Sequence, residues 1–197
     1  MAAPHASIVT ITPNPALDVS TSVDEVVAEH KLRCGPTRLD PGGGGVNVSR
    51  VIRNLGGSSL AVYAVGGPTG QAYREILERE GVVGRVVRIG GSTRESFTVD
   101  ETSTGQQYRF VLQGPTMHEP EWRALLAAVA DDFQVSGYVV PSGSLPPGAP
   151  TDLYARIALA DCARRGKLVT VPDREAYAAR YPDALDEIER AGIEAAV

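Results

Sequence analysis

The chain has 197 residues, enough for one or two domains with a substantial hydrophobic core. Its 24 acidic and 19 basic residues give a net charge of −5, which argues against a broad nucleic-acid-binding surface and restricts any anion site to a local cluster. There is no apolar run of about 18 residues and no basic, then apolar, signal peptide at the start, so we expect a cytoplasmic protein without a membrane partner. Cys34 and Cys162 are far apart and form no Cys-x-x-Cys pair, so neither a disulfide framework nor a zinc site is indicated.

The first part of the chain alternates strand and helix patterns. Segment 6–12 is continuously apolar or β-branched, as in a strand covered on both faces. Apolar residues then recur at helical spacing up to the Gly56-Gly57 pair, and further strand and helix patterns follow. The apolar residues of the first helix are Val48, Val51, Ile52 and Leu55, and the later elements are expected over 60–65 (strand), 69–80 (helix) and 84–89 (strand). This order predicts an α/β fold with a largely parallel sheet.

Two β-rich stretches interrupt the alternation. Segments 94–100 and 106–112 are joined by the turn-forming residues 102–105, which favours a hairpin. Residues 19–38 also have the pattern of a strand pair rather than a helix. We therefore expect a small accessory β-sheet beside the α/β body.

The alternation returns after residue 119. A helix from Pro120 has Trp122, Leu125, Leu126, Val129 and Phe133 on one face. A strand at 138–140, a helix over 151–165 ending at Gly166 and a strand at 167–171 are expected to follow. Beyond Asp173 the pattern predicts two short helices separated at Pro182.

A run of glycines, Pro41-Gly42-Gly43-Gly44-Gly45-Val46-Asn47, stands immediately before a predicted helix. Glycines let a ligand approach the backbone, and a helix start offers free N–H donors, so the run indicates a binding loop; a flexible loop is the alternative. The dinucleotide-binding pattern Gly-x-Gly-x-x-Gly fails because Asn47 stands where its last glycine is required. The phosphate-binding P-loop is also absent, since Gly166-Lys167 is followed by Leu168.

Two more polar loops follow predicted strands. Asn14-Pro15-Ala16-Leu17-Asp18 comes after the first strand, and the small-residue loop 142–148 comes after the strand at 138–140. The carboxyl ends of parallel strands meet at one edge of a sheet, so these loops and the glycine run predict a pocket for a polar small molecule. Taken alone, an aspartate in a loop such as Asp18 is usually a turn or capping residue.

Four basic residues suggest what that molecule carries. Lys31, Arg33, Arg94 and Arg109 all belong to the accessory sheet, where a cluster of positive charge would suit a phosphate group. The alternative is that they are solvated charges that protect strand edges. The histidines at 5, 30 and 118 lack metal-ligand spacing and predict no metal site.

Taken together, these motifs resemble the ribokinase-like PfkB sugar kinases, particularly the minor 6-phosphofructokinase branch. The resemblance covers about residues 6–171 and rests on six motifs in order: 14–18, Lys31-Leu32-Arg33-Cys34, 41–47, Thr93-Arg94-Glu95, Gln107-Tyr108-Arg109-Phe110-Val111 and 142–148. It implies a ribokinase-like α/β sandwich with a β-sheet lid that often pairs with a second subunit as a homodimer. It also implies phosphorylation of a sugar phosphate with ATP and Mg²⁺.

Matched position by position, the resemblance implies roles for nine residues. Asp18, Gly43 and Asn47 would bind the sugar hydroxyls, whereas Arg94, with Lys31, Arg109 and Ser144, would contact the phosphate of the sugar or the lid near it. Gly44 and Arg33 complete the expected substrate-binding set. Which sugar phosphate is bound stays open between fructose 6-phosphate, tagatose 6-phosphate and fructose 1-phosphate.

The sequence also departs from the family. Members carry an Asn-x-x-Glu motif associated with magnesium and a later Gly-Ala-Gly-Asp motif with the catalytic base, and neither occurs here. We therefore expect a ribokinase-like substrate-binding part over 1–171, with the lid at about 19–38 and 94–112, a divergent helical tail over 172–197, and no C-terminal nucleotide-binding part. The expected protein is a truncated kinase without its base; the alternatives are a non-catalytic sugar-phosphate-binding or dimerising remnant, or an unstable remnant without function.

Overall fold

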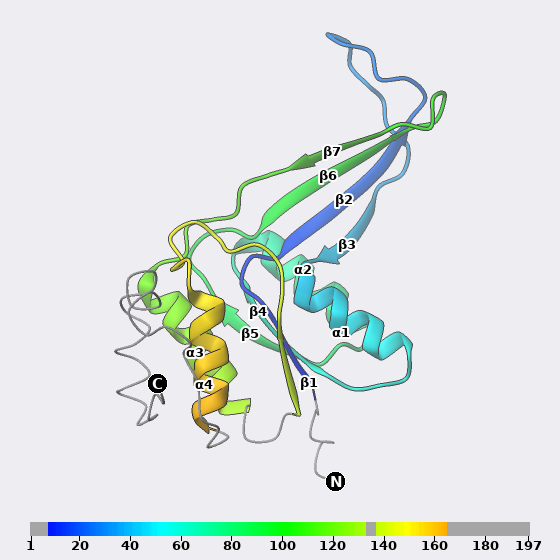
Figure 1. Ribbon diagram of the computed structural model, residues 1–197. Coiled ribbons are helices and arrows are strands. Elements are labelled where there is room, and N and C mark those ends of the chain that lie inside the picture. The colour runs from blue at the N-terminus through cyan, green and yellow to red at the C-terminus, as the bar shows by residue number, and fades with distance from the viewer. Residues whose placement is uncertain (1–7, 133–136, 165–197) are drawn as a thin grey trace, which may run out of the picture.

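The computed structural model describes residues 8–132 and 137–164, and its body is built on a four-stranded parallel sheet (Figure 1). The strands are β1 (Ile8–Thr12), β4 (Leu60–Val65), β5 (Gly84–Arg88) and β8 (Tyr138–Pro141), in the order β5-β4-β1-β8. β1 pairs with β4 on one side and β8 on the other, and all the pairings are parallel. The expected α/β fold with a largely parallel sheet is confirmed.

Helices cover both faces of this sheet, so it is the middle layer of a sandwich. The helices are α1 (Gly44–Asn54), α2 (Gly67–Arg79), α3 (Glu119–Asp132) and α4 (Leu153–Arg164). On the α3 and α4 side the buried core includes Ile11, Val62, Trp122, Leu125 and Ile157. On the α1 and α2 side it includes Val46, Ala61, Tyr63, Tyr73 and Leu77. Two apolar faces explain why β1 and β4 are continuously apolar or β-branched rather than alternating.

The helix predicted after the glycine run is present, but a different face of it is buried. α1 packs on the sheet through Gly45, Val46 and Ser49, and the Ser49 hydroxyl lies 2.7 Å from that of Thr10 in β1. Val51 and Leu55, from the expected apolar stripe, are 55% and 82% exposed. Close approach to β1 selects small residues at this contact, and helical periodicity alone does not detect them.

A second four-stranded sheet extends from the body (Figure 1). Its strands are β2 (Ala16–Val23), β3 (Arg38–Gly42), β6 (Arg94–Glu101) and β7 (Gln107–Val111), in the order β3-β2-β6-β7. β6 and β7 form the expected antiparallel hairpin, whereas β2 and β6 pair in parallel along their whole lengths. We call this second sheet the lid sheet.

The strand pair expected over 19–38 is wrong in its bounds. β2 already begins at Ala16, its antiparallel partner β3 begins only at Arg38, and residues 24–37 between them contain no strand. The neighbouring strand β6 ends at Glu101, opposite Val23, so the chain beyond this point has no strand to pair with. The 24–37 loop is instead attached to the lid sheet by individual hydrogen bonds, such as the one from Val26 N–H to the Glu101 carboxylate at 2.5 Å.

Some predicted features fall outside the described residues. These are Phe133, the helix end at Gly166, the strand at 167–171 and the helices after Asp173. Among the helices that the structure does describe, none combines the length and apolar character needed to cross a membrane.

Leu125→Ala is expected to lower the free energy of unfolding by about 3 kcal/mol, because it leaves a cavity between α3 and the sheet. Leu125 is fully buried in this core. The matched control is Leu55→Ala, directly after the end of α1, where the leucine is 82% exposed and the change should cost less than about 0.5 kcal/mol. Urea unfolding followed by circular dichroism measures both, and equal losses would contradict the described packing.

Candidate functional site

The three polar loops singled out in the sequence meet at the carboxyl ends of β1 and β8. Gly45 N–H donates to the Ser142 carbonyl at 3.3 Å, which joins the glycine run to the loop after β8. The Asn14 amide donates to the Ser144 hydroxyl at 3.2 Å, which joins the loop after β1 to the same segment. The loops therefore form one continuous rim.

The glycine run is fixed by close backbone contacts. A Cβ on Gly45 would lie 2.5 Å from the Ile11 carbonyl oxygen, and one on Gly44 would overlap the Ser142 hydroxyl. Gly43 has a φ of +135°, a conformation that favours glycine. The first turn of α1 is held by the Thr12 hydroxyl, which accepts a hydrogen bond from Val46 N–H at 2.9 Å. The run is thus an ordered helix start rather than a flexible loop.

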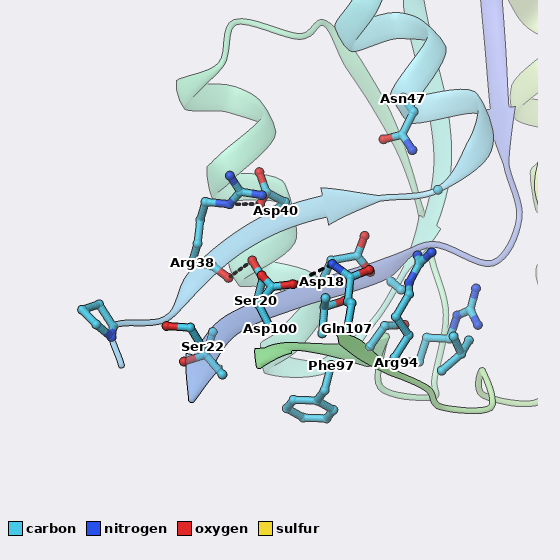
Figure 2. Close-up of a pocket in the computed structure, with 18 of the residues that line it drawn as sticks. Asp18, Ser20, Ser22, Arg38, Asp40, Asn47, Arg94, Phe97, Asp100 and Gln107 are labelled. Atoms are coloured by element: carbon cyan, nitrogen blue, oxygen red, sulfur yellow. Dashed lines mark hydrogen bonds and ion pairs between the residues drawn. The ribbon is translucent and has the colours of Figure 1, made fainter. Parts of the chain in front are cut away.

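A cleft of about 860 Å³ opens between this helix start and the polar face of the lid sheet (Figure 2). Five of the nine predicted site residues line it: Asp18, Gly43, Asn47, Arg94 and Arg109. Figure 2 shows Asp18 and Arg94 on the cleft side of the lid sheet, with the Phe97 ring on the opposite side. The arrangement offers a carboxylate and an amide together with two guanidinium groups.

The other four predicted residues take different positions. Ser144 borders the site through its hydroxyl, which accepts a hydrogen bond from Arg94 at 3.4 Å, and Gly44 follows Gly43 in the helix start. Lys31 and Arg33 lie in the exposed 24–37 loop and are not among the residues that line the cleft. The structure therefore brings seven of the nine residues together and leaves the two loop cations apart.

Arg94 is oriented by its surroundings. Its guanidinium donates to the Leu112 carbonyl at 3.2 Å and the Asn14 carbonyl at 3.1 Å. These two carbonyls lie at the exit of β7 and the entry to β2, so Arg94 is fixed where the lid sheet joins the body. Arg109 on β7 is exposed and makes no hydrogen bond or ion pair with any residue that the structure describes, so its charge is available in the cleft.

The Asp18 carboxylate is half-buried and open. It forms no hydrogen bond or ion pair with the residues in the described ranges, although Arg109 and Arg94 act on it at longer distance. Burial raises the pKa of the Asp18 carboxyl above its ordinary value of 3.8, and the two arginines only partly oppose this effect. An unpaired carboxylate that is costly to keep ionised is well suited to accept hydrogen bonds from a ligand.

Four further charged residues line the cleft that the sequence did not single out: Arg38, Asp40, Arg50 and Asp100. Asp40 stands directly opposite Asp18 in the β2–β3 register. Arg50 follows Asn47 by one helical turn, which places both residues on the same face of α1. That spacing was a usable signal for Arg50, whereas Asp40 could be found only from the cross-strand register.

The described residues offer no cluster for a metal. No group of three or more histidine, cysteine, aspartate or glutamate side chains in those ranges is placed to hold a metal ion. The chemistry that they do support is the binding of a polar anionic molecule through hydrogen bonds and guanidinium groups.

Asp18→Asn is expected to raise the thermal unfolding midpoint of the ligand-free protein at neutral pH. Because burial raises the pKa of Asp18, the ionised carboxylate is less favourable in the folded than in the unfolded chain. The gain should shrink as the pH falls toward 3.8, where the carboxyl becomes protonated in both states. Thermal denaturation over a pH series measures this, and a lower midpoint for the variant at neutral pH would show that Asp18 stabilises the fold.

Comparison with known proteins relates this geometry to a family. The model of the pfkB family of carbohydrate kinases matches residues 14–189. ATP-dependent 6-phosphofructokinase isozyme 2 of Mycobacterium tuberculosis (strain CDC 1551 / Oshkosh) is 48% identical over 166 residues, 84% of this chain and 48% of the relative. Tagatose-6-phosphate kinase of Staphylococcus epidermidis (strain ATCC 35984) is 33% identical over 150 residues, 76% of this chain and 48% of the relative. The chain thus spans about half the length of these relatives.

A solved structure supports the same relationship. Phosphofructokinase-2 from Escherichia coli in complex with fructose-6-phosphate superposes with a TM-score of 0.75 at 37% identity, over 84% of this chain and 55% of that one. The resemblance inferred from the motifs is confirmed: the chain belongs to the pfkB family of carbohydrate kinases.

Proposed function

We propose that this chain is the sugar-phosphate-binding part of an ATP-dependent kinase of the 6-phosphofructokinase type, which transfers a phosphoryl group to a hexose phosphate. The observation that carries the proposal is the cleft itself. It places the open carboxylate of Asp18 and the amide of Asn47 together with Arg94 and Arg109. The hydroxyls of a sugar phosphate suit Asp18 and Asn47, and its phosphate dianion suits Arg94 and Arg109.

The sugar end of the ligand is assigned to the helix start. The Asp18 carboxylate accepts hydrogen bonds from sugar hydroxyls, and the Asn47 side chain provides both a donor and an acceptor. Gly43 and Gly44 let the sugar approach the backbone at the beginning of α1, because no side chain stands there. The phosphate end is assigned to Arg94, Arg109 and the Ser144 hydroxyl.

In the proposed reaction ATP is the phosphoryl donor, and Mg²⁺ neutralises the negative charge of its phosphates. The described residues form no metal cluster, so the roles assigned to them stop at binding and orienting the sugar phosphate. Holding the acceptor in a fixed position itself contributes much of the rate acceleration in enzymatic phosphoryl transfer. We place the activity in the cytoplasm, in keeping with the acidic composition and with the absence of a spanning helix in the described part.

Arg109→Ala is expected to weaken the binding of fructose 6-phosphate about tenfold and to leave the weaker binding of fructose unchanged, because only the phosphate meets this guanidinium. Isothermal titration calorimetry with both sugars measures the preference. The matched control is Arg88→Ala, which removes an equally exposed arginine outside the cleft. If the wild-type chain binds neither sugar, or binds both equally, the proposed ligand is wrong.

A second candidate function, as a dimerising module, is favoured by the other face of the lid sheet. Val19 stands opposite Leu39 and Phe97, and Phe97 stands opposite Phe110, so these four side chains share one face. Leu39 and Phe110 are 44% and 56% exposed. We propose that this face pairs with the same face of a second copy, giving a homodimer through the lid.

Pairing would also account for the two cations that lie away from the cleft. Lys31 and Arg33 extend from the lid sheet on the 24–37 loop. We propose that this loop of one copy reaches the phosphate site of the other, since Lys31 and Arg33 are exposed and do not line the cleft of their own copy. Lys31 and Arg33 would then be substrate-binding residues that one copy supplies to the other.

Phe110→Asp is expected to weaken the dimer at least about tenfold, because it places a charge in the apolar contact. Sedimentation velocity over a concentration series measures the dissociation constant. Leu55→Asp, directly after the end of α1, is the control, since it adds the same charge at an exposed apolar residue outside the lid. A wild-type chain that stays monomeric at high concentration would exclude lid pairing.

A further inference from the structure

Two carboxylates face each other across β2 and β3. Asp18 and Asp40 are directly opposite in the register and share the face that lines the cleft. Like charges in such a position destabilise a sheet unless a counter-charge is near. The Asp18 carboxylate lies directly over Gly42, where a Cβ would overlap Asp18 Oδ2. The pair therefore needs compensation.

Among the described residues, only Asp40 of the two carboxylates has ion-pair partners. Asp40 Oδ2 lies 2.7 Å from Arg38 Nε, and Asp40 Oδ1 lies 3.4 Å from the Arg50 guanidinium. Figure 2 shows the Arg38–Asp40 pair as a dashed line, whereas Asp18 has no ion pair with any residue in the described ranges. The charge of Asp40 is thus balanced within the protein, and the acceptor capacity of Asp18 is left for a ligand.

Arg50 is itself held in place by Glu80 and by the Pro41 carbonyl. Its Nε and one NH₂ group donate to the two carboxylate oxygens of Glu80, at the end of α2, at 2.7 and 2.8 Å. Its other NH₂ group donates to the Pro41 carbonyl at 3.4 Å. A bidentate pair of this kind fixes the plane of the guanidinium. Glu80 therefore holds the Arg50 guanidinium beside Asp40 and out of direct contact with Asp18.

We infer that Arg50, anchored by Glu80, is a positioning residue that pairs with Asp40 and thereby keeps Asp18 ionised and open to the sugar. The inference deepens the proposed function, on which it rests for the identity of the ligand. Arg50 itself contacts Asp40 and the carbonyl of Pro41, the residue directly before the glycine run.

All the charged groups that act on Asp18 can be named. Arg109 on β7, Arg94 on β6 and Arg50 on α1 lower the pKa of its carboxyl, whereas Asp40 on β3 raises it. Removal of the Arg50 charge leaves Asp40 less well balanced, so the pKa of Asp18 rises further. The ionised carboxylate is the form that accepts hydrogen bonds from sugar hydroxyls. On acidification, a variant without the Arg50 charge should therefore lose affinity for the sugar at a higher pH than the wild-type protein does.

The test is to titrate the Asp18 carboxyl by ¹³C NMR in the ligand-free protein. Arg50→Gln should raise its midpoint, and adding Asp40→Asn to that variant should return the midpoint to the wild-type value or below. Glu80→Gln should shift it in the opposite direction, because the released guanidinium can reach Asp18. Arg53→Gln is the matched control: Arg53 is on the same helix and bonds the Glu80 carbonyl at 3.0 Å, but does not line the cleft.

An Asp18 midpoint that is unchanged in both Arg50→Gln and Glu80→Gln overturns the inference. Glu80→Gln keeps the test decisive if Arg50→Gln does not fold. In parallel, fructose 6-phosphate binding measured across the same pH range should become about threefold weaker in Arg50→Gln at mildly acidic pH. If the wild-type chain binds no fructose 6-phosphate while the midpoints move as stated, the proposed function fails and the role of Arg50 toward Asp18 stands.

Discussion

The site depends on the close packing of the start of α1 against the end of β1. Gly45 lies so near the Ile11 carbonyl that a methyl group has no room, and the Thr12 hydroxyl accepts the N–H of Val46. From the other side, the buried Tyr73 hydroxyl donates to the Gly42 carbonyl at 2.9 Å. These contacts set the position of Asn47 and Arg50 one and two turns along the helix. A shift of α1 would therefore move the whole floor of the cleft.

Charge is distributed over the cleft in two different ways. The arginines at 38 and 50 are used inside the protein, where they balance Asp40. Arg109 has no partner among the described residues, and Arg94 is held mainly by backbone carbonyls that leave its charge uncancelled. Across the lid sheet the charge therefore changes from the free positive charge of Arg94 on β6 and Arg109 on β7 to the open carboxylate of Asp18 on β2. Such a gradient orients a ligand that has hydroxyls at one end and a phosphate at the other.

Much of this arrangement could be predicted from the sequence, because it depends on local patterns. Continuous apolar runs identified β1 and β4, and the glycines before a helix identified the binding loop. The bounds of β3, the buried face of α1 and the role of Asp40 could not, since each is decided by what lies opposite in space. The bounds of β3 depend on where β6 ends, and the buried face of α1 depends on how closely that helix approaches β1. The third depends on a register that places Asp40 beside Asp18.

The junction between the two sheets connects binding to the position of the lid sheet. Arg94 bonds the Asn14 carbonyl where the chain enters β2 and the Leu112 carbonyl where it leaves β7, and Asn14 in turn bonds Ser144 after β8. The same guanidinium is therefore both a proposed phosphate ligand and a tie between the lid and the body. An anion that draws Arg94 toward the cleft must pull on both strand connections. In the proposed complex, a phosphate bound by Arg94 would therefore act on both connections of the lid sheet through a single side chain.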